Sequence, residues 1–457
     1  MPRDAFQLFA RLGRFRLRFK LAGTDTLSLD LICGSLPKET FIMRRLWCWN
    51  LVVLSLMLTG AASAQSFDDA VAAYKRKDYA SALSLFRSLA EKGNPKAQGN
   101  LGAMYAKGEG VPQNFDEAIK WYRRGADQGE PHSQYNLGVR YDHGGGVAQD
   151  YAEALKWYRL AAAQGDVLAH GNLGVMYANG HGVTQDFAEA VTHFRFAAER
   201  GEAQSQDNLA ILYATGHGVP QDETEAVRWF NLAARQGNAQ AQYNLGVRYA
   251  KGEGVGQNND EAIKYYREAA DQGYADAENN LGGAYESGMG VAVDDVVAVK
   301  WFRLAALHNS AKGETNLGIM YANGKGVTQD FAEARKWFER GAGHGEVVAQ
   351  RNLGALYATG RGVPQSYMEA AKYYGAAAKH GDEASGSILE KIHAVQAHES
   401  ARAQMSSSPQ SSRIEPGIFR LSSPVMERRS VSVGPPPMIR MVGGGGMMGG
   451  GMHFGRR

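Results

Sequence analysis

Residues 241–266 read AQYNLGVRYAKGEGVGQNNDEAIKYY, and close copies of this stretch recur every 36 residues. The Asn-Leu pair within it occurs in eight copies, from Asn100-Leu101 to Asn352-Leu353, with no insertion or deletion between them. A tyrosine follows each of these leucines by four residues. A fixed period of this length is typical of repeat proteins, in which each unit buries its apolar face against its neighbours.

Each unit predicts two helices. In the first unit, the spacing of apolar residues around Leu101 predicts a helix over 95–107 that ends at Gly108. A Gly-x-Gly pair follows this helix in every unit. The second helix begins after a capping residue, Asn114 in the first unit, and Glu117 and its matches predict a capping box in seven of the eight units. We therefore expect an all-α fold, a right-handed α/α superhelical solenoid of two-helix repeats with flanking cap helices.

Composition and pattern divide the chain into six segments. They are an upstream extension (1–42), a signal peptide (43–64), an N-terminal cap hairpin (65–93), eight repeats (94–381), a C-terminal cap helix (382–402) and a disordered Ser/Pro/Gly/Met-rich tail (403–457).

Residues 43–64 have the three parts of a secretory signal peptide: the basic pair Arg44-Arg45, an apolar run over 51–58, and a small-residue site ending at Ala64. The run is much shorter than the ~20 residues that span a bilayer. We expect cleavage after Ala64, a periplasmic or secreted mature chain without a transmembrane span, and the loss of both cysteines. Residues 1–42 then have two interpretations, an assigned start upstream of a true start at Met43 or a second basic targeting arm.

The charge of the chain is unevenly distributed. The formal net charge of +3 combines 17 Lys/Arg and seven Asp/Glu in residues 1–64 and 398–457 with 33 Lys/Arg and 40 Asp/Glu in residues 65–397. The repeat region is therefore acidic, with a net charge of 33 − 40 = −7. This balance argues against a nucleic-acid-binding function.

The tail leaves three interpretations open. Its composition is typical of a flexible basic tether. Its positive charge is also consistent with weak contact to anionic envelope surfaces. A third interpretation is capture of a soft metal by the side chains Met447, Met448, Met452 and His453.

No motif for phosphate binding, a nucleophile elbow or a zinc helix occurs in the sequence. We therefore predict no catalytic, cofactor-binding or metal-ligating residues and no cofactor. His181 and His217 occupy a loop position that varies freely between units, so we interpret them as solvated. The asparagine at position 100 and its matches is interpreted as a structural amide that bonds backbone groups across the layer or the loop.

The repeat unit quoted above resembles the Sel-one-like repeat family, a branch of the tetratricopeptide-like α-helical solenoids, and residues 65–93 resemble an ordinary tetratricopeptide hairpin. The resemblance implies an adaptor scaffold for protein complexes, often exported in bacteria and serving signalling, envelope or exopolysaccharide assembly. A cysteine-rich subgroup is linked to penicillin binding and β-lactam hydrolysis. Its repeats carry paired cysteines, which the expected mature chain lacks, so that activity is not carried over.

A partner-binding groove is predicted on the side of each first helix that faces away from Leu101 and its matches. One row on this side is largely apolar and a neighbouring row varies from unit to unit, which is what recognition of a peptide segment requires. The alternative is that the apolar row packs between helices. The predicted groove residues are Tyr135, Val139, Val175, Ile211, Tyr243, Val247 and Ile319.

We therefore expect an exported, non-catalytic scaffold that mediates protein–protein interaction in the bacterial cell envelope, as an adaptor or regulator of a signalling, secretion or exopolysaccharide complex. Two alternatives stay open. The first is a cell-wall-directed enzyme of the β-lactamase-like subgroup. The second is direct binding of glycan or peptidoglycan strands by the Trp and Tyr residues (Trp121, Trp157, Trp229, Trp301 and Trp337).

Overall fold

A computed structural model describes residues 14–19, 27–32 and 66–406 of the chain. The predicted signal peptide, its cleavage site and the tail beyond Ser406 lie outside the described residues. The chain divides into two compact units, residues 1–85 and 86–457.

The first unit contains a short hairpin and the start of the helical region. Strand β1 (Arg14–Phe19) pairs antiparallel with β2 (Leu27–Ile32), an element that the all-α prediction did not include. Helix α3 (Phe67–Lys75) is capped by Ser66, which forms a complete capping box with Asp69. A turn with Lys77 at a positive φ of 62° leads into α4 (Tyr79–Glu91), which crosses into the second unit.

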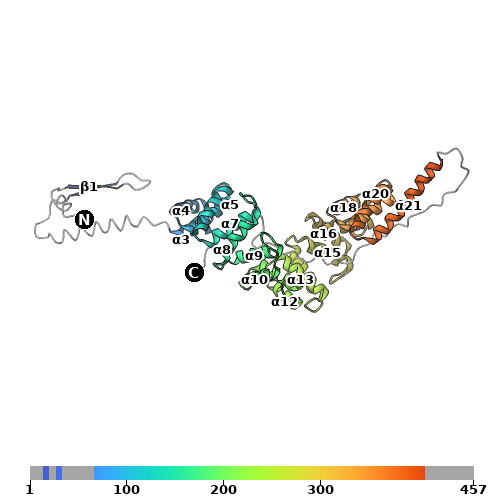
Figure 1. Cartoon of the computed structure of the whole chain (residues 1–457), viewed down its shortest axis with the longest axis horizontal. Helices are drawn as coiled ribbons and strands as arrows, with labels where there is room; N and C mark the ends of the chain where they lie inside the picture. Colours follow the sequence, from blue (N-terminus) through green and yellow to red (C-terminus); the bar gives the residue numbers. More distant parts are fainter. Residues whose placement is uncertain (1–13, 20–26, 33–65, 407–457) are drawn as a thin grey trace. The chain divides into compact units, whose positions relative to one another are not determined.

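The second unit confirms the all-α solenoid of two-helix, 36-residue repeats (Figure 1). Each helix from α5 to α21 packs against the next one in the chain. The first helices of the repeats are α5 (Pro95–Lys107), α7 (Pro131–His143), α9 (Val167–Asn179), α11 (Ala203–Thr215), α13 (Ala239–Lys251), α15 (Ala275–Ser287), α17 (Ala311–Asn323) and α19 (Val347–Thr359). The second helices are α6 (Phe115–Asp127), α8 (Tyr151–Ala162), α10 (Phe187–Glu199), α12 (Glu223–Arg235), α14 (Asn259–Ala270), α16 (Asp295–Leu307), α18 (Phe331–Gly343) and α20 (Tyr367–Lys379). The last helix, α21 (Glu383–Ser406), continues four residues beyond the segment predicted for it.

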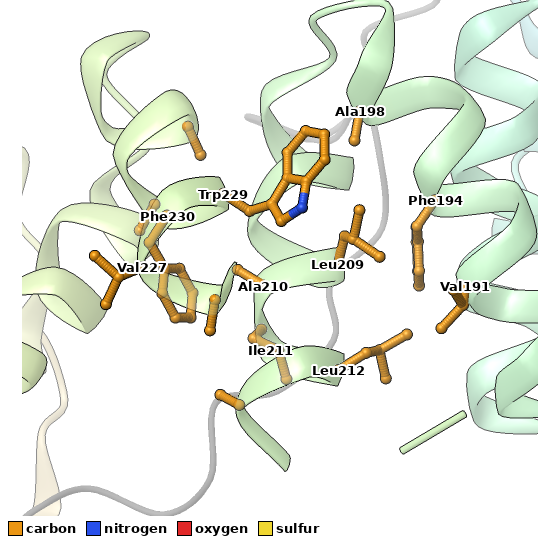
Figure 2. Packing of buried hydrophobic residues seen from close by; sticks show 14 of the residues in the cluster. Val191, Phe194, Ala198, Leu209, Ala210, Ile211, Leu212, Val227, Trp229 and Phe230 are labelled. Atoms are coloured by element: carbon orange, nitrogen blue, oxygen red, sulfur yellow. The ribbon is translucent and has the colours of Figure 1, made fainter. Parts of the chain in front are cut away.

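The core of the solenoid is continuous from one repeat to the next. One cluster of buried side chains contains residues from five successive helices, α9 to α13. In Figure 2, Leu209 and Leu212 of α11 lie towards Phe194 of α10. Leu209 and Phe230 are each 0% exposed. Because no repeat encloses its own apolar face, each one depends on its neighbours for burial.

A small residue after each Asn-Leu pair lets the two helices of a repeat approach closely. A Cβ added at Gly102 would lie 2.7 Å from the ring of Tyr122, and one at Gly174 would lie 2.6 Å from the ring of Phe194. Such distances are well inside van der Waals contact. The aromatic side chain of the second helix therefore packs directly on the backbone of the first helix.

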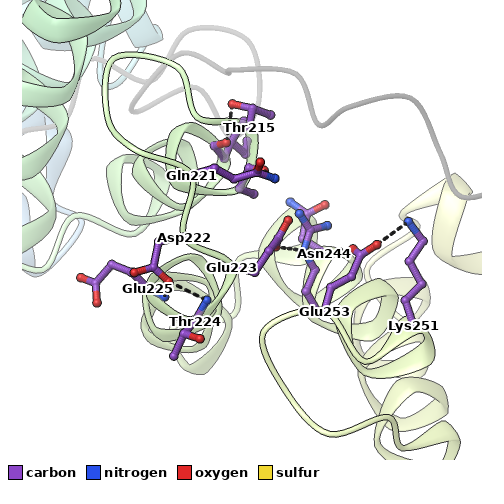
Figure 3. Close-up of polar contacts among 12 residues, drawn as sticks. Thr215, Gln221, Asp222, Glu223, Thr224, Glu225, Asn244, Lys251 and Glu253 are labelled. Carbon is purple, nitrogen blue, oxygen red and sulfur yellow. Dashed lines mark hydrogen bonds and ion pairs between the residues drawn. The ribbon is translucent and has the colours of Figure 1, made fainter.

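The capping boxes predicted for the second helices are only half formed. The capping side chain accepts a backbone N–H in all eight helices, as Asp222 does from Thr224 and Glu225 (Figure 3). The backbone N–H of Asp222, however, donates to the carbonyl oxygen of Tyr213 at 2.9 Å rather than to Glu225. This bond satisfies a carbonyl near the end of the first helix, which would otherwise lack a partner. The reciprocal half of the box was therefore predicted wrongly, because the tertiary bond takes its donor.

Candidate interaction surface

The predicted groove residues lie mostly in the interior. Six of the seven are buried, with exposed fractions of 1% to 7%, and Val139 is partly exposed. The buried members are Tyr135, Val175, Ile211, Tyr243, Val247 and Ile319, and each belongs to a hydrophobic cluster. This burial favours the alternative interpretation, that the row packs between helices. Contact between these side chains and a partner stays a prediction.

The first helices are enclosed because they also touch one another across repeats. Asn244 of α13 donates from Nδ2 to Oδ1 of Asp207 in α11 at 3.3 Å. Asn316 of α17 makes the matching bond to Asn279 of α15 at 2.7 Å. The repeated asparagine thus bonds across the layer at these two interfaces, but to a side chain and not to the predicted backbone group, and at Asn100 it bonds the carbonyl of Lys96 in its own helix. The side of the helix assigned to a groove is occupied by the next repeat.

Exposed charged side chains lie on the second helices instead. One row of cations there is neutralised within its own helix, because each cation lies three residues after a glutamate. The N–O distances are 3.0–3.4 Å, as in Lys120–Glu117 and Lys372–Glu369. We call this set the paired-cation row: Lys120, Lys156, Arg228, Lys264, Lys336 and Lys372.

A second row of cations lies three residues further along and is bonded differently. Each arginine in it donates from Nη2 to the phenol oxygen of the repeated tyrosine in the next repeat, as Arg159 does to Tyr177 at 2.7 Å. Arg123 makes the same bond to Tyr141, and Arg195 makes it to Tyr213 at 3.0 Å. We call this set the arginine row: Arg87, Arg123, Arg159, Arg195, Arg267 and Arg303.

The arginine row has no acidic partner. Among the described residues, no carboxylate oxygen lies within 4.0 Å of any of its six guanidinium groups. Five of the six side chains are exposed and Arg123 is partly exposed. The arginine row is therefore an accessible series of positive charges, held in place by neutral phenols.

Aromatic residues lie on the same helices as the two cation rows. Trp121, Trp157 and Trp229 are buried, with 5–6% exposure, whereas Trp301 and Trp337 are partly exposed. Asn231 and Glu339 stand where the arginine row would have an arginine. In these two places the repeated tyrosine stacks on an aromatic ring, as Tyr249 does on Tyr265 with centroids 5.6 Å apart. The surface therefore combines half-exposed rings with guanidinium groups.

Sequence reasoning missed the arginine row, although a signal for it was present. An arginine follows the Trp, Tyr or His of the second helix by two residues in five of the eight repeats, as Arg123 follows Trp121. A count of charge alone does not separate this row from the paired-cation row. The difference lies in the glutamate that precedes each paired cation by three residues.

A polar contact joins the first and second helices in six of the repeats. In four repeats it is a bond between two glutamines, such as Gln128 to Gln98 at 2.7 Å. In the next two repeats, histidine and glutamate replace the glutamines, and His308 and His344 lie 2.9 Å from the buried carboxylates of Glu278 and Glu314. Arg340 also contacts Glu314, at 2.8 Å.

The third repeat carries two histidines in contact. Nδ1 of His170 lies 2.9 Å from Nδ1 of His193, and Nε2 of His170 lies 3.1 Å from the carbonyl oxygen of Ala162. Burial, then the neighbouring His170 and Arg159, lowers the pKa of His193 to about 4. Burial likewise lowers the pKa of His170.

These histidines predict a loss of stability in mild acid. Between about pH 6.5 and pH 4 the unfolded chain binds protons that the folded chain excludes, so the free energy of unfolding falls as the pH falls. For His193 the expected loss is about 1–3 kcal/mol. The double variant His170→Gln with His193→Trp restores the residues found at these positions in other repeats. Urea unfolding at about pH 7.5 and about pH 4.5 should show a smaller loss for this variant than for the wild type. The exposed His143→Gln is the control, and equal losses in all three proteins would contradict the prediction.

The loop histidines do not form a metal site. His181 stacks on Tyr151, with centroids 4.6 Å apart, and His217 stacks on Phe187 at 4.7 Å. Over the described ranges, no cluster of three or more His, Cys, Asp or Glu side chains is arranged to hold a metal ion. No helix between residues 66 and 406 combines the length and apolarity needed to span a bilayer.

Comparisons with known proteins agree with this architecture. The profile of the Sel1 repeat matches nine consecutive segments, 73–94 and then every 36 residues from 95–130 to 347–382. A Sel1 repeat protein from Oxalobacter formigenes is 34% identical, with 68% of this chain and 90% of that chain covered and a TM-score of 0.53. A protective antigen of uropathogenic Escherichia coli strains with an SLR fold is 31% identical over 74% of this chain and 84% of that chain, with a TM-score of 0.46. No curated protein sequence matches the chain.

Proposed function

The chain belongs to the Sel1 repeat family, whose fold is typical of protein–protein interaction scaffolds, and we propose that it is an exported, non-catalytic scaffold that holds protein partners in the bacterial cell envelope. In the envelope, the protein would act as an adaptor or regulator of a signalling, secretion or exopolysaccharide complex. The signal-peptide pattern over 43–64 supports export.

The arginine row is the observation that carries the binding role. A solenoid needs side chains for packing, and the clusters of buried residues account for those. Exposed arginines without acidic partners are not needed for packing, yet they recur in register with the repeats. A periodic, accessible row of this kind fits a partner that lies along several repeats.

A capture experiment tests the scaffold role. We expect the immobilised mature chain, residues 65–457, to retain defined proteins from an envelope extract, identified by mass spectrometry. The same chain unfolded in urea is the control and should retain none of them. Binding to glycan strands without protein capture, or turnover of cell-wall or β-lactam substrates by the purified chain, would contradict the proposal.

Export has a separate test. The protein recovered from the envelope or the medium should begin at Gln65, as read by N-terminal peptide mass. Recovery of an uncleaved chain in the cytoplasm would overturn the proposed location without affecting the scaffold role.

A further inference from the structure

We propose that the arginine row binds an extended acidic polypeptide segment. The inference rests on the proposed scaffold function and names the chemistry of its partner. It follows from three properties of the arginine row: unused hydrogen-bond donors, periodicity and charge.

The first property is the number of hydrogen-bond donors that each guanidinium group leaves unused. A guanidinium group has five N–H donors, and the bond to the tyrosine phenol uses one of them. In Arg159 and Arg195 the others have no carboxylate partner. Arginine binds carboxylates with two parallel hydrogen bonds, so each member of the arginine row can take one carboxylate of a ligand. The phenol holds the side chain in position, which lowers the entropy lost on binding.

The second property is periodicity. Arg87, Arg123, Arg159 and Arg195 lie on α4, α6, α8 and α10, so one arginine occurs on every second helix of the chain. A partner that reaches several of them has to extend along successive repeats.

The third property is charge. Residues 65–397 carry a net charge of −7, so an acidic partner is repelled by most of the solenoid and attracted by the arginine row. The row is interrupted at Asn231 and again at Glu339. Glu339 is itself paired with Arg335, at 2.6 Å, and places a negative charge where an arginine would be. These interruptions limit the longest run to the four repeats from Arg87 to Arg195.

Fluorescence anisotropy with a defined probe tests the inference. The protein is the whole mature chain, and the probe is a labelled peptide of repeated Glu-Pro-Pro units. The triple variant Arg123→Gln, Arg159→Gln and Arg195→Gln should raise its Kd at least about tenfold. The charge-matched control, Lys120→Gln, Lys156→Gln and Arg228→Gln, removes three members of the paired-cation row and should leave the Kd within about twofold. Circular dichroism should be unchanged for both, because Asn231 and Glu339 show that repeats fold without this arginine.

A gain-of-binding variant provides a second readout. Asn231→Arg joins the interrupted runs into one and should lower the Kd of the Glu-Pro-Pro peptide several-fold. Equal losses of affinity in the two triple variants would overturn the proposal, because binding would then follow net charge alone. Binding of polygalacturonic acid with no binding of the peptide would also overturn it and would assign the arginine row to anionic polysaccharide. If envelope proteins are captured but not released by the peptide, this inference fails while the scaffold function stands.

Discussion

Replacing Phe230 with alanine should lower the free energy of unfolding by about 3–5 kcal/mol. The ring is 0% exposed and lies in the cluster that joins α9 to α13. It packs against α11 at Ala210, the position that is glycine in the other seven repeats. Removal of the ring leaves a cavity at the contact between the two helices of the repeat, so both the apolar transfer energy and the packing are lost.

The control lies on the same helix. Leu232 is 37% exposed, and its replacement by alanine should change stability by no more than about 0.5 kcal/mol. Urea unfolding followed by circular dichroism measures both variants. A Phe230→Ala protein as stable as Leu232→Ala would show that this aromatic row is not the core of the solenoid.

The second large effect is expected at Gly326. This residue has a φ of +64°, and a Cβ added to it would lie 2.1 Å from the carbonyl oxygen of Asp295, the first residue of α16 in the preceding repeat. Alanine at Gly326 therefore adds left-handed strain of about 1–2 kcal/mol and also forces the loop away from the preceding repeat. We expect a total loss of at least about 3 kcal/mol in the free energy of unfolding.

Gly345 separates the two causes. Its φ is +81°, but nothing lies within 4 Å of an added Cβ, so Gly345→Ala should cost only the left-handed strain. That cost is about 1–2 kcal/mol. The difference between the two variants, measured by urea unfolding, reports the contact between repeats. Equal losses would show that conformational strain alone explains the second glycine of each Gly-x-Gly pair.

Local rules made the helices predictable. The helix expected over 95–107 is α5, and Gly108 ends it with a φ of +74°. Each of these features depends on residues within one turn of helix, so the local sequence suffices to predict it. The repeat then carries the prediction to the other seven units, because identical spacing imposes identical contacts.

The candidate site was less predictable. A helical wheel correctly places Val175 and Ile211 on one side of their helices, but it cannot say whether that side meets solvent or another repeat. The structure places them at 1% and 2% exposure. The arginine row was not predicted at all. Arg159 and Tyr177 are 18 residues apart in the sequence, and they meet only because one repeat stacks on the next.

The sequence by itself determined the two-helix repeat, the ends of the repeat helices and the stacking of one repeat on another, because these follow from periodicity and from short-range hydrogen bonding. Tertiary structure decided the partners of the polar groups that bond outside their own helix. The N–H of Asp222 bonds Tyr213 instead of Glu225, which leaves the glutamate to neutralise Arg228. No equivalent glutamate reaches Arg195, whose partner is a neutral phenol, so its charge stays available at the surface. The physical reason is that a polar group bonds the partner that lies near it in the folded chain, and the order of residues in the sequence does not reveal which partner that is.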